Sequence, residues 1–131
     1  MKATGSFEVK LQPLNNYATG EAGTTLGRMS IDKTFQGDLV ATSRGEMLSA
    51  MTPIEGSAGY VAIEQVSGTL NGKQGTFVLQ HFGITNAAES RLVLEVVPDS
   101  GTGELASLTG KMMIQNQDGK HTYQFDYALS A

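Results

Sequence analysis

The sequence predicts an all-β protein, an eight-stranded antiparallel up-and-down barrel that forms one domain over residues 1–131. Apolar and polar residues alternate with a period of two in one run after another, as in half-buried strands. Two of the turns carry Asn71-Gly72 and Asp118-Gly119, dipeptides that favour two-residue hairpin loops. No segment has the length and pattern of a long helix. Closing such a meander into a barrel removes both exposed sheet edges.

Composition narrows the classes of function. The net charge is −4 and no basic cluster is present, so nucleic acid is not expected as a partner. The absence of cysteine removes disulfides, thiolate metal ligands and thiol nucleophiles, and predicts a cytoplasmic protein. The first ten residues lack a signal peptide's apolar core, and no apolar run approaches the roughly 20 residues that span a bilayer, so no membrane partner is expected.

The first third of the chain contains three expected strands. Residues Thr4–Leu11 alternate as a half-buried strand, which Pro13 ends. The polar segment Asn15–Thr25 is either a lid or simply a long loop. Residues 26–51 then predict two long strands that turn around Gly37.

Charged side chains gather on one face of these two strands if the turns have even length. Such turns place Lys33 on the same face as Thr42, Arg44 and Glu46. An exposed ladder of cross-strand charges is the favoured interpretation. A polar rim or ligand anchor is the alternative.

The hairpin over residues 59–84 carries the main chemical lead. A two-residue turn at Asn71-Gly72 places Ala62 opposite His81, with Glu64 one diagonal step away. A four-residue loop would place Glu64 directly opposite His81. Either loop has even length and directs one set of side chains to the more apolar face: Tyr60, Ala62, Glu64, Val66, Leu70, Phe77, Leu79 and His81.

The segment after this hairpin holds one strand and one glycine motif. Residues 91–97 are apolar on nearly both faces, which predicts a strand packed inside and covered outside, and hence a homo-oligomer. Gly101, Gly103 and Ala106 have the GxGxxA spacing of a dinucleotide-binding loop. That fingerprint requires a full crossover helix, whereas residues 104–108 allow only a short helical turn. No cofactor is therefore predicted.

The last hairpin, residues 112–129, turns at Asp118-Gly119. His121 beside this turn is expected to be exposed. Its separation from His81, without a carboxylate cluster at ligand spacing, predicts no metal site. The hairpin's core face is expected to carry Met112, Ile114, Tyr123, Phe125 and Tyr127. The two tyrosines are either core residues or pocket donors, and the core role is favoured.

Several strings together resemble a bacterial family of small proteins classed only as a domain of unknown function: LGRMSIDKTFQGDL, GEMLSA, GSAGYVAIEQVSGTLNGKQGTFVLQH, VVPDSGTGEL and FDY. That family resembles allene oxide cyclase and the dirigent proteins in fold, and GTGELASLTG is similar to a glycine-bounded turn between two of their barrel strands. The resemblance implies a calycin-like barrel with a ligand cavity. Allene oxide cyclases steer cyclisation of a fatty-acid epoxide and dirigent proteins steer radical coupling of phenols, but no functional residue is carried over from either.

Two interpretations of the polar residues remain open. Glu64 and His81 either satisfy each other within the core or act as a general acid and base toward a ligand, with Tyr60 as a hydroxyl donor. The leading hypothesis is a barrel that binds a small apolar or amphipathic molecule, in the manner of an isomerase or cyclase. The alternative is a non-enzymatic structural or oligomerising barrel. Ligand contacts are predicted for Phe77, Leu79, Tyr123, Phe125 and Tyr127.

Overall fold

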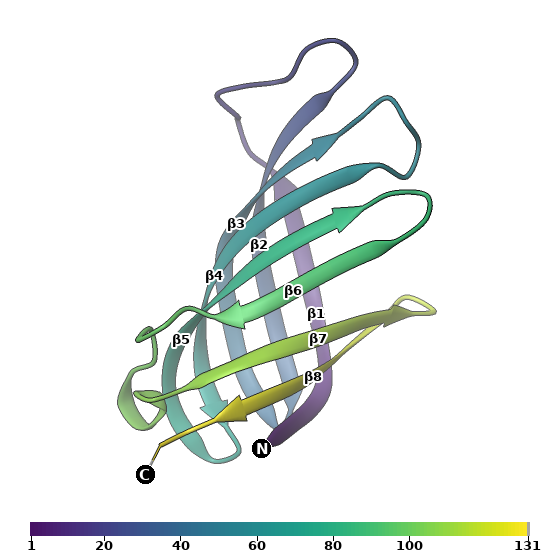
Figure 1. Ribbon diagram of the computed structural model, residues 1–131. Coiled ribbons are helices and arrows are strands. Elements are labelled where there is room, and N and C mark those ends of the chain that lie inside the picture. The colour runs from purple at the N-terminus through teal and green to yellow at the C-terminus, as the bar shows by residue number, and fades with distance from the viewer. Residues whose placement is uncertain (131) are drawn as a thin grey trace.

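The computed structural model describes residues 1–130 and is a closed barrel of eight antiparallel strands in sequence order, which confirms the predicted fold class (Figure 1). β1 pairs with both β2 and β8, which closes the sheet on itself. Within residues 1–130, no helix has the length and hydropathy that a membrane-spanning segment requires. The elements are β1 (Lys2–Pro13), β2 (Thr25–Gly37), β3 (Leu39–Met51), β4 (Ala58–Leu70), β5 (Lys73–Thr85), β6 (Ser90–Val96), the 3₁₀ turn η1 (Gly103–Leu105), β7 (Thr109–Gln117) and β8 (Lys120–Ala128).

The two hairpin dipeptides form the turns that their chemistry predicts. Asn71 and Gly72 have φ values of 46° and 85°, and Asp118 and Gly119 have 54° and 78°. These positive values suit a two-residue turn between twisted strands. The register places Ala62 opposite His81. The shorter of the two loops considered for this hairpin is therefore the one that forms.

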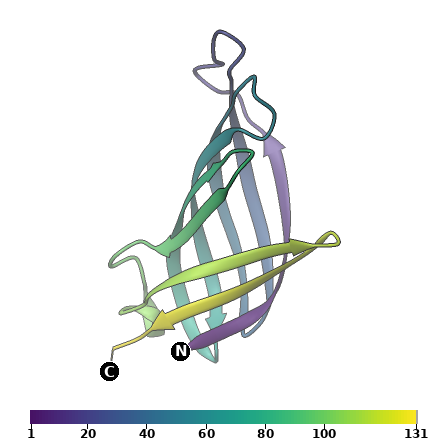
Figure 2. The same cartoon turned by 45° about the vertical axis from the view of Figure 1, so that its right-hand side comes forward.

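The two ends of the barrel differ. The end that carries the N-terminus also has the short β2–β3 and β4–β5 turns and the β6–β7 connection, while the long loops 14–24, 52–57 and 86–89 lie at the other end (Figures 1 and 2). β6 and β7 pair through only two positions, Leu94 with Met112 and Glu95 with Lys111. Toward the long loops these two strands diverge, and the wall of the barrel opens there (Figure 2).

The short-loop end is filled by a hydrophobic core. Phe77 stacks on Phe125 at a ring-centroid distance of 5.9 Å, and Phe125 stacks on Tyr127 at 5.3 Å. Leu105 and Leu108, in and just after η1, are buried and close this end. Aromatic rings and leucines therefore leave this half of the interior solid.

One sequence expectation about the β2–β3 hairpin was wrong. Only Asp38 separates the two strands, and this odd connection pairs Lys33 with Ser43. Lys33 therefore points into the barrel, while Thr42, Arg44 and Glu46 point outward, because a shift of one residue reverses the face of every side chain. On the outside, Arg44 and Glu46 do form cross-strand ion pairs, but with residues outside the expected cluster: Arg44 pairs with Asp32 at 3.6 Å, and Glu46 pairs with Arg28 at 2.6 Å.

Tyr123 closes the β2–β3 turn from within the core. Its hydroxyl accepts a hydrogen bond from the Leu39 amide at 2.9 Å and donates one to the Gln36 carbonyl at 2.8 Å. Burial raises the pKa of Tyr123, and the Leu39 amide partly opposes this shift. The hydroxyl of Tyr127 instead accepts a bond from the side-chain amide of exposed Asn71 at 2.7 Å. Both rings are core residues, the role favoured from sequence.

We expect Tyr123→Phe to lower the free energy of unfolding by about 1–3 kcal/mol, because the buried Leu39 amide loses its hydrogen-bond acceptor. Tyr127→Phe is the matched control and should cost less than about 1 kcal/mol, because the exposed Asn71 amide can bind water instead. Urea unfolding of both variants measures the difference. Equal losses would contradict the role assigned to Tyr123.

Candidate functional site

Four polar side chains from neighbouring strands meet inside the barrel: Lys33 on β2, Ser43 on β3, Glu64 on β4 and His81 on β5. Each is at most 6% exposed. Glu64 Oε2 lies 2.9 Å from Lys33 Nζ and 2.6 Å from His81 Nε2, and its Oε1 accepts the Ser43 hydroxyl at 2.9 Å. Glu64 is therefore the centre of this buried polar cluster.

The strands make room for the cluster in two ways. Gly45 lies opposite Glu64 on β3, where a Cβ atom would collide with the Ile63 carbonyl and press on the Glu64 backbone. The Lys33 ammonium lies 5.0 Å from the centroid of the Phe7 ring and 5.7 Å from that of Phe35. Two aromatic faces thus partly replace the water that the buried ammonium lost.

Glu64 is ionised in the folded protein. Burial raises the pKa of its carboxyl group, but the hydrogen bond from His81 and the positive charge of Lys33 outweigh burial and lower the pKa to about 2. Lys33 supplies the balancing charge of a buried ion pair.

Tyr60 connects the cluster to the open end of the barrel. Its hydroxyl lies 3.3 Å from His81 Nδ1, on the opposite side of the imidazole from Glu64. When His81 is neutral and its Nε2–H donates to Glu64, Nδ1 accepts the Tyr60 O–H. Burial, and then the negative charge of Glu64, raise the pKa of Tyr60, so its phenol stays protonated at neutral pH. The ring is held over Gly83, where a Cβ atom would collide with it.

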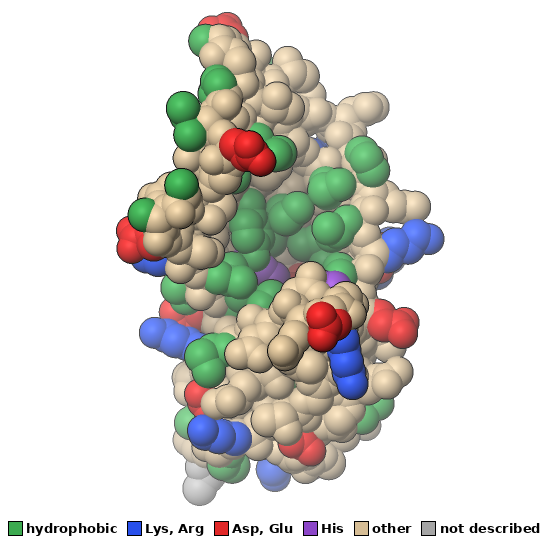
Figure 3. Space-filling model, turned by 90° about the vertical axis from the view of Figure 1, so that its right-hand side faces the viewer, with side chains coloured by type: hydrophobic (Ala, Val, Ile, Leu, Met, Phe, Trp, Pro, Cys, Tyr) green, Lys and Arg blue, Asp and Glu red, His purple; other side chains and the backbone are tan. Residues whose placement is uncertain are grey.

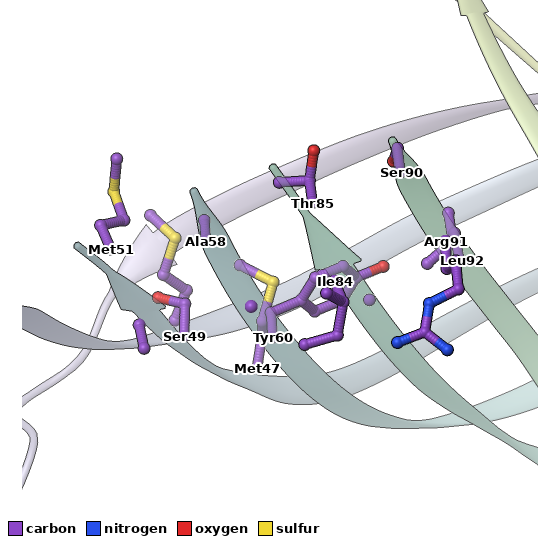
Figure 4. A pocket seen from close by; sticks show the side chains of 14 residues that line it. Met47, Ser49, Met51, Ala58, Tyr60, Ile84, Thr85, Ser90, Arg91 and Leu92 are labelled. Carbon is purple, nitrogen blue, oxygen red and sulfur yellow. The ribbon is translucent and has the colours of Figure 1, made fainter. Parts of the chain in front are cut away.

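A pocket of about 380 Å³ occupies the inner side of the open end, next to the cluster. Figure 3 shows a hollow lined by hydrophobic side chains with histidine at its floor. In the close view of Figure 4, the Tyr60 ring extends between the neighbouring strands. Tyr60 is the residue of the pocket lining that hydrogen-bonds to the cluster. The other inward-facing side chains of the lining are mostly apolar or small: Met29, Met47, Ser49, Met51, Ala58, Thr85, Ser90 and Leu92.

The structure brings together three of the residues singled out from sequence. Glu64, His81 and Tyr60 share the inner face of β4 and β5, as the even turn at Asn71-Gly72 requires. The five expected ligand contacts instead pack in the filled half of the barrel and do not line the pocket: Phe77, Leu79, Tyr123, Phe125 and Tyr127.

Other parts of the site were missed from sequence. Lys33 and Ser43 belong to the cluster because of the odd β2–β3 turn. Met29, Met47 and Met51 of the pocket lining lie on the inner face of the same two strands. For Met29, the sequence signal was the alternation of inward side chains on β2, which places Met29 on the same face as Ile31.

His121 differs from its expected position. It is half-buried on the inner face of β8, with its ring centroid 5.0 Å from that of Phe7. The strand alternation that buries Tyr123 turns His121 to the same side. Within residues 1–130, no three side chains of the His, Cys, Asp or Glu type are grouped so as to hold a metal ion.

We expect the ionisation of Glu64 to shape acid stability. Its pKa falls from 4.5 in the unfolded chain to about 2 in the folded one. Its contribution is therefore complete above pH 4.5 and disappears as the pH falls from 4.5 toward 2. Glu64→Gln should remove this part of the pH dependence. At neutral pH it should also lower stability by about 3–5 kcal/mol, because Lys33 stays buried without a counter-charge.

Urea unfolding at a series of pH values measures this effect. Glu46→Gln is the control, because its carboxylate is exposed, and it should keep the acid-side slope of the unaltered protein. If Glu64→Gln does not fold, the double variant Lys33→Met/Glu64→Gln removes both charges and serves the same comparison. An unchanged slope between pH 4.5 and 2 would contradict the assignment to Glu64.

Comparison with known proteins supplies a family but no activity. The family model described as a protein of unknown function, DUF3224, matches residues 3–127. A crystal structure of a DUF3224 protein with unknown function from Shewanella oneidensis MR-1 is 60% identical in sequence, with a TM-score of 0.97. The similarity covers 100% of this chain and 98% of the Shewanella chain. No curated protein matches the sequence. The chain therefore belongs to the DUF3224 family of proteins of unknown function.

Proposed function

We propose that this protein binds a small apolar or amphipathic molecule in the open end of its barrel and moves a proton to or from it through Tyr60, His81 and Glu64. One observation carries the proposal: the Tyr60 side chain lines the pocket, and its hydroxyl contacts an imidazole that is itself held by a buried carboxylate. This is an acid–base arrangement that ends in a ligand-sized space.

The lining of the pocket supports an apolar ligand. Met29, Met47 and Met51 supply flexible, polarisable walls that adapt to the shape of a bound molecule. Few polar groups reach the same space, and Tyr60 is the one connected to the buried charges. The best-fitting ligand has a hydrophobic body and one oxygen or acidic hydrogen placed at the Tyr60 hydroxyl.

The proposed proton transfer uses Tyr60 as a relay. Tyr60 passes its proton to His81 Nδ1 as it receives one from the ligand, and the resulting imidazolium is stabilised by Glu64 at 2.6 Å from Nε2. Return of a proton through Tyr60 to a different atom of the ligand completes an isomerisation or ring closure. Atoms and electrons balance without a further reactant. In this scheme Tyr60 and His81 are catalytic, and Glu64 acts through His81.

A non-enzymatic structural barrel is the second candidate. The observation that favours it is the complete pairing of the cluster: Glu64 accepts bonds from Lys33, Ser43 and His81, as a purely structural polar core requires. Under this alternative the pocket stays empty and Tyr60 only caps the imidazole. The two experiments below separate these possibilities.

Two sequence expectations stay proposals. A cytoplasmic location rests on the absence of cysteine from the chain. The expected likeness to allene oxide cyclases and dirigent proteins also stays a prediction, because the matched family and the Shewanella protein are both of unknown function.

Pocket binding can be tested with the neutral fluorophore N-phenyl-1-naphthylamine. We expect saturable fluorescence enhancement with the unaltered protein. Met47→Trp should weaken binding at least about tenfold, because an indole fills part of the pocket. Met113→Trp is the matched control, since Met113 is exposed on β7, and should bind as the unaltered protein does. Equal binding by the two variants, or no saturable binding, would contradict a ligand site here.

Proton transfer can be tested by deuterium incorporation into a panel of small enolisable ketones in D₂O, followed by NMR. We expect the protein to accelerate exchange, and Tyr60→Phe and His81→Ala each to reduce it by about 10²–10⁴-fold. Tyr127→Phe is the control and should retain the rate, because Tyr127 lies in the filled half. If the protein binds the fluorophore but accelerates deuterium exchange into none of the ketones, the pocket is a binding site only and the catalytic role of Tyr60 and His81 is refuted.

A further inference from the structure

The outer face of β3–β6 carries a contiguous stripe of exposed apolar side chains. Leu48, Val61, Phe82 and Val93 occupy the same register position on the four strands. They are 54%, 48%, 46% and 41% exposed. Side chains directly opposite each other on neighbouring strands lie about 5 Å apart, so the four form one surface, here named the outer apolar row. Ile63 and Ile84 extend it on either side. An apolar surface of this kind marks an interaction site.

Charges border the row differently at its two ends. At β3, Glu46 is already paired with Arg28 of the same chain at 2.6 Å. At β6, Arg91 and Glu95 lie two residues before and after Val93, both exposed, and neither forms an ion pair within residues 1–130. Lys111 on β7 lies opposite Glu95 in register. Figure 4 shows Arg91 and Ile84 pointing away from Ser90 and Thr85, which face the pocket.

The pattern around the row is complementary to itself. Consider a second copy related by a two-fold axis that runs along the row and lies in the interface. Each strand then faces its own copy in the reverse direction. Arg91 meets the partner subunit's Glu95, and Glu95 meets the partner subunit's Arg91. Ile63 meets the partner subunit's Gly59, where the missing side chain leaves space on the outer face.

The other face-to-face arrangement is less favourable. A two-fold axis along the strands would place β3 over β6 of the second copy. Glu95 would then face the partner subunit's Glu46, so two carboxylates would oppose each other at both ends of the interface. Charge therefore selects the axis along the row.

We propose that two copies of this chain form a symmetric dimer through the outer apolar row, with Phe82 and Val61 at its centre and reciprocal Arg91–Glu95 ion pairs at the β6 edge. Binding of an unrelated protein would not require this face to be complementary, in charge and side-chain size, to a second copy of itself rotated about a two-fold axis. The proposal does not rest on the ligand site: Leu48, Val61, Phe82 and Val93 do not line the pocket, although Gly59, Ile84 and Arg91 beside the row also border it.

Analytical ultracentrifugation of the full chain at about 1–100 μM tests the dimer. We expect the unaltered protein to sediment as a dimer and Phe82→Asp as a monomer, because a carboxylate would be buried at the centre. Met113→Asp, at an exposed apolar position on β7, should stay dimeric. A monomeric unaltered protein at about 100 μM, or a dimer that survives Phe82→Asp, would overturn the proposal. Circular dichroism establishes that each variant is folded.

Charge reversal tests the two-fold geometry itself. Arg91→Glu and Glu95→Arg should each weaken the dimer at least about tenfold, because each creates two like-charge contacts. The double variant Arg91→Glu/Glu95→Arg restores opposite charges across the axis and should recover most of the lost affinity. Failure of the double variant to recover, while both single variants weaken the dimer, would overturn the pairing of Arg91 with the partner subunit's Glu95.

Discussion

A buried carboxylate is the constraint on which the interior of this protein depends. Glu64 has no exposed surface, and a charge in that position is tolerated only with partners on every side. The neighbouring strands each supply one: Lys33, Ser43 and His81 all reach its two oxygens. Satisfying Glu64 thus ties four strands together at mid-barrel. The same requirement fixes the orientation of the His81 ring, whose free nitrogen then faces Tyr60.

The cluster also marks the boundary between two kinds of interior. On one side, Phe77, Phe125 and the residues around η1 pack into the buried hydrophobic core. On the other side, methionines and small residues leave a pocket, and β6 diverges from β7. The interior of an eight-stranded barrel is just wide enough either to be filled by side chains or to hold one small ligand. In this barrel, side chains pack one half and a pocket occupies the other. Polar groups at such a boundary are sheltered from water yet within reach of a bound molecule.

Sequence reasoning was accurate where local turn chemistry decided the answer. Both loop lengths considered at Asn71-Gly72 are even, so the shared face of Glu64, His81 and Tyr60 followed from strand alternation whichever loop forms. It was wrong for Lys33, because the single residue Asp38 between β2 and β3 reverses parity and no dipeptide signals such a turn. The expected ligand contacts were drawn from the most apolar inner positions. Large aromatic residues such as Phe77 and Phe125 pack against each other in the solid half, away from the pocket.

The sequence by itself determined the all-β class, the number of strands, most of their boundaries and the inward direction of Glu64 and His81. These follow from alternation and turn residues, which act over a few positions of the chain. Only the tertiary structure decided that Lys33 and Ser43 complete the cluster, that the pocket lies at the long-loop end, and that Leu48, Val61, Phe82 and Val93 align in one row. Those outcomes depend on the register between strands far apart in the chain and on how closure of the barrel distributes its interior volume.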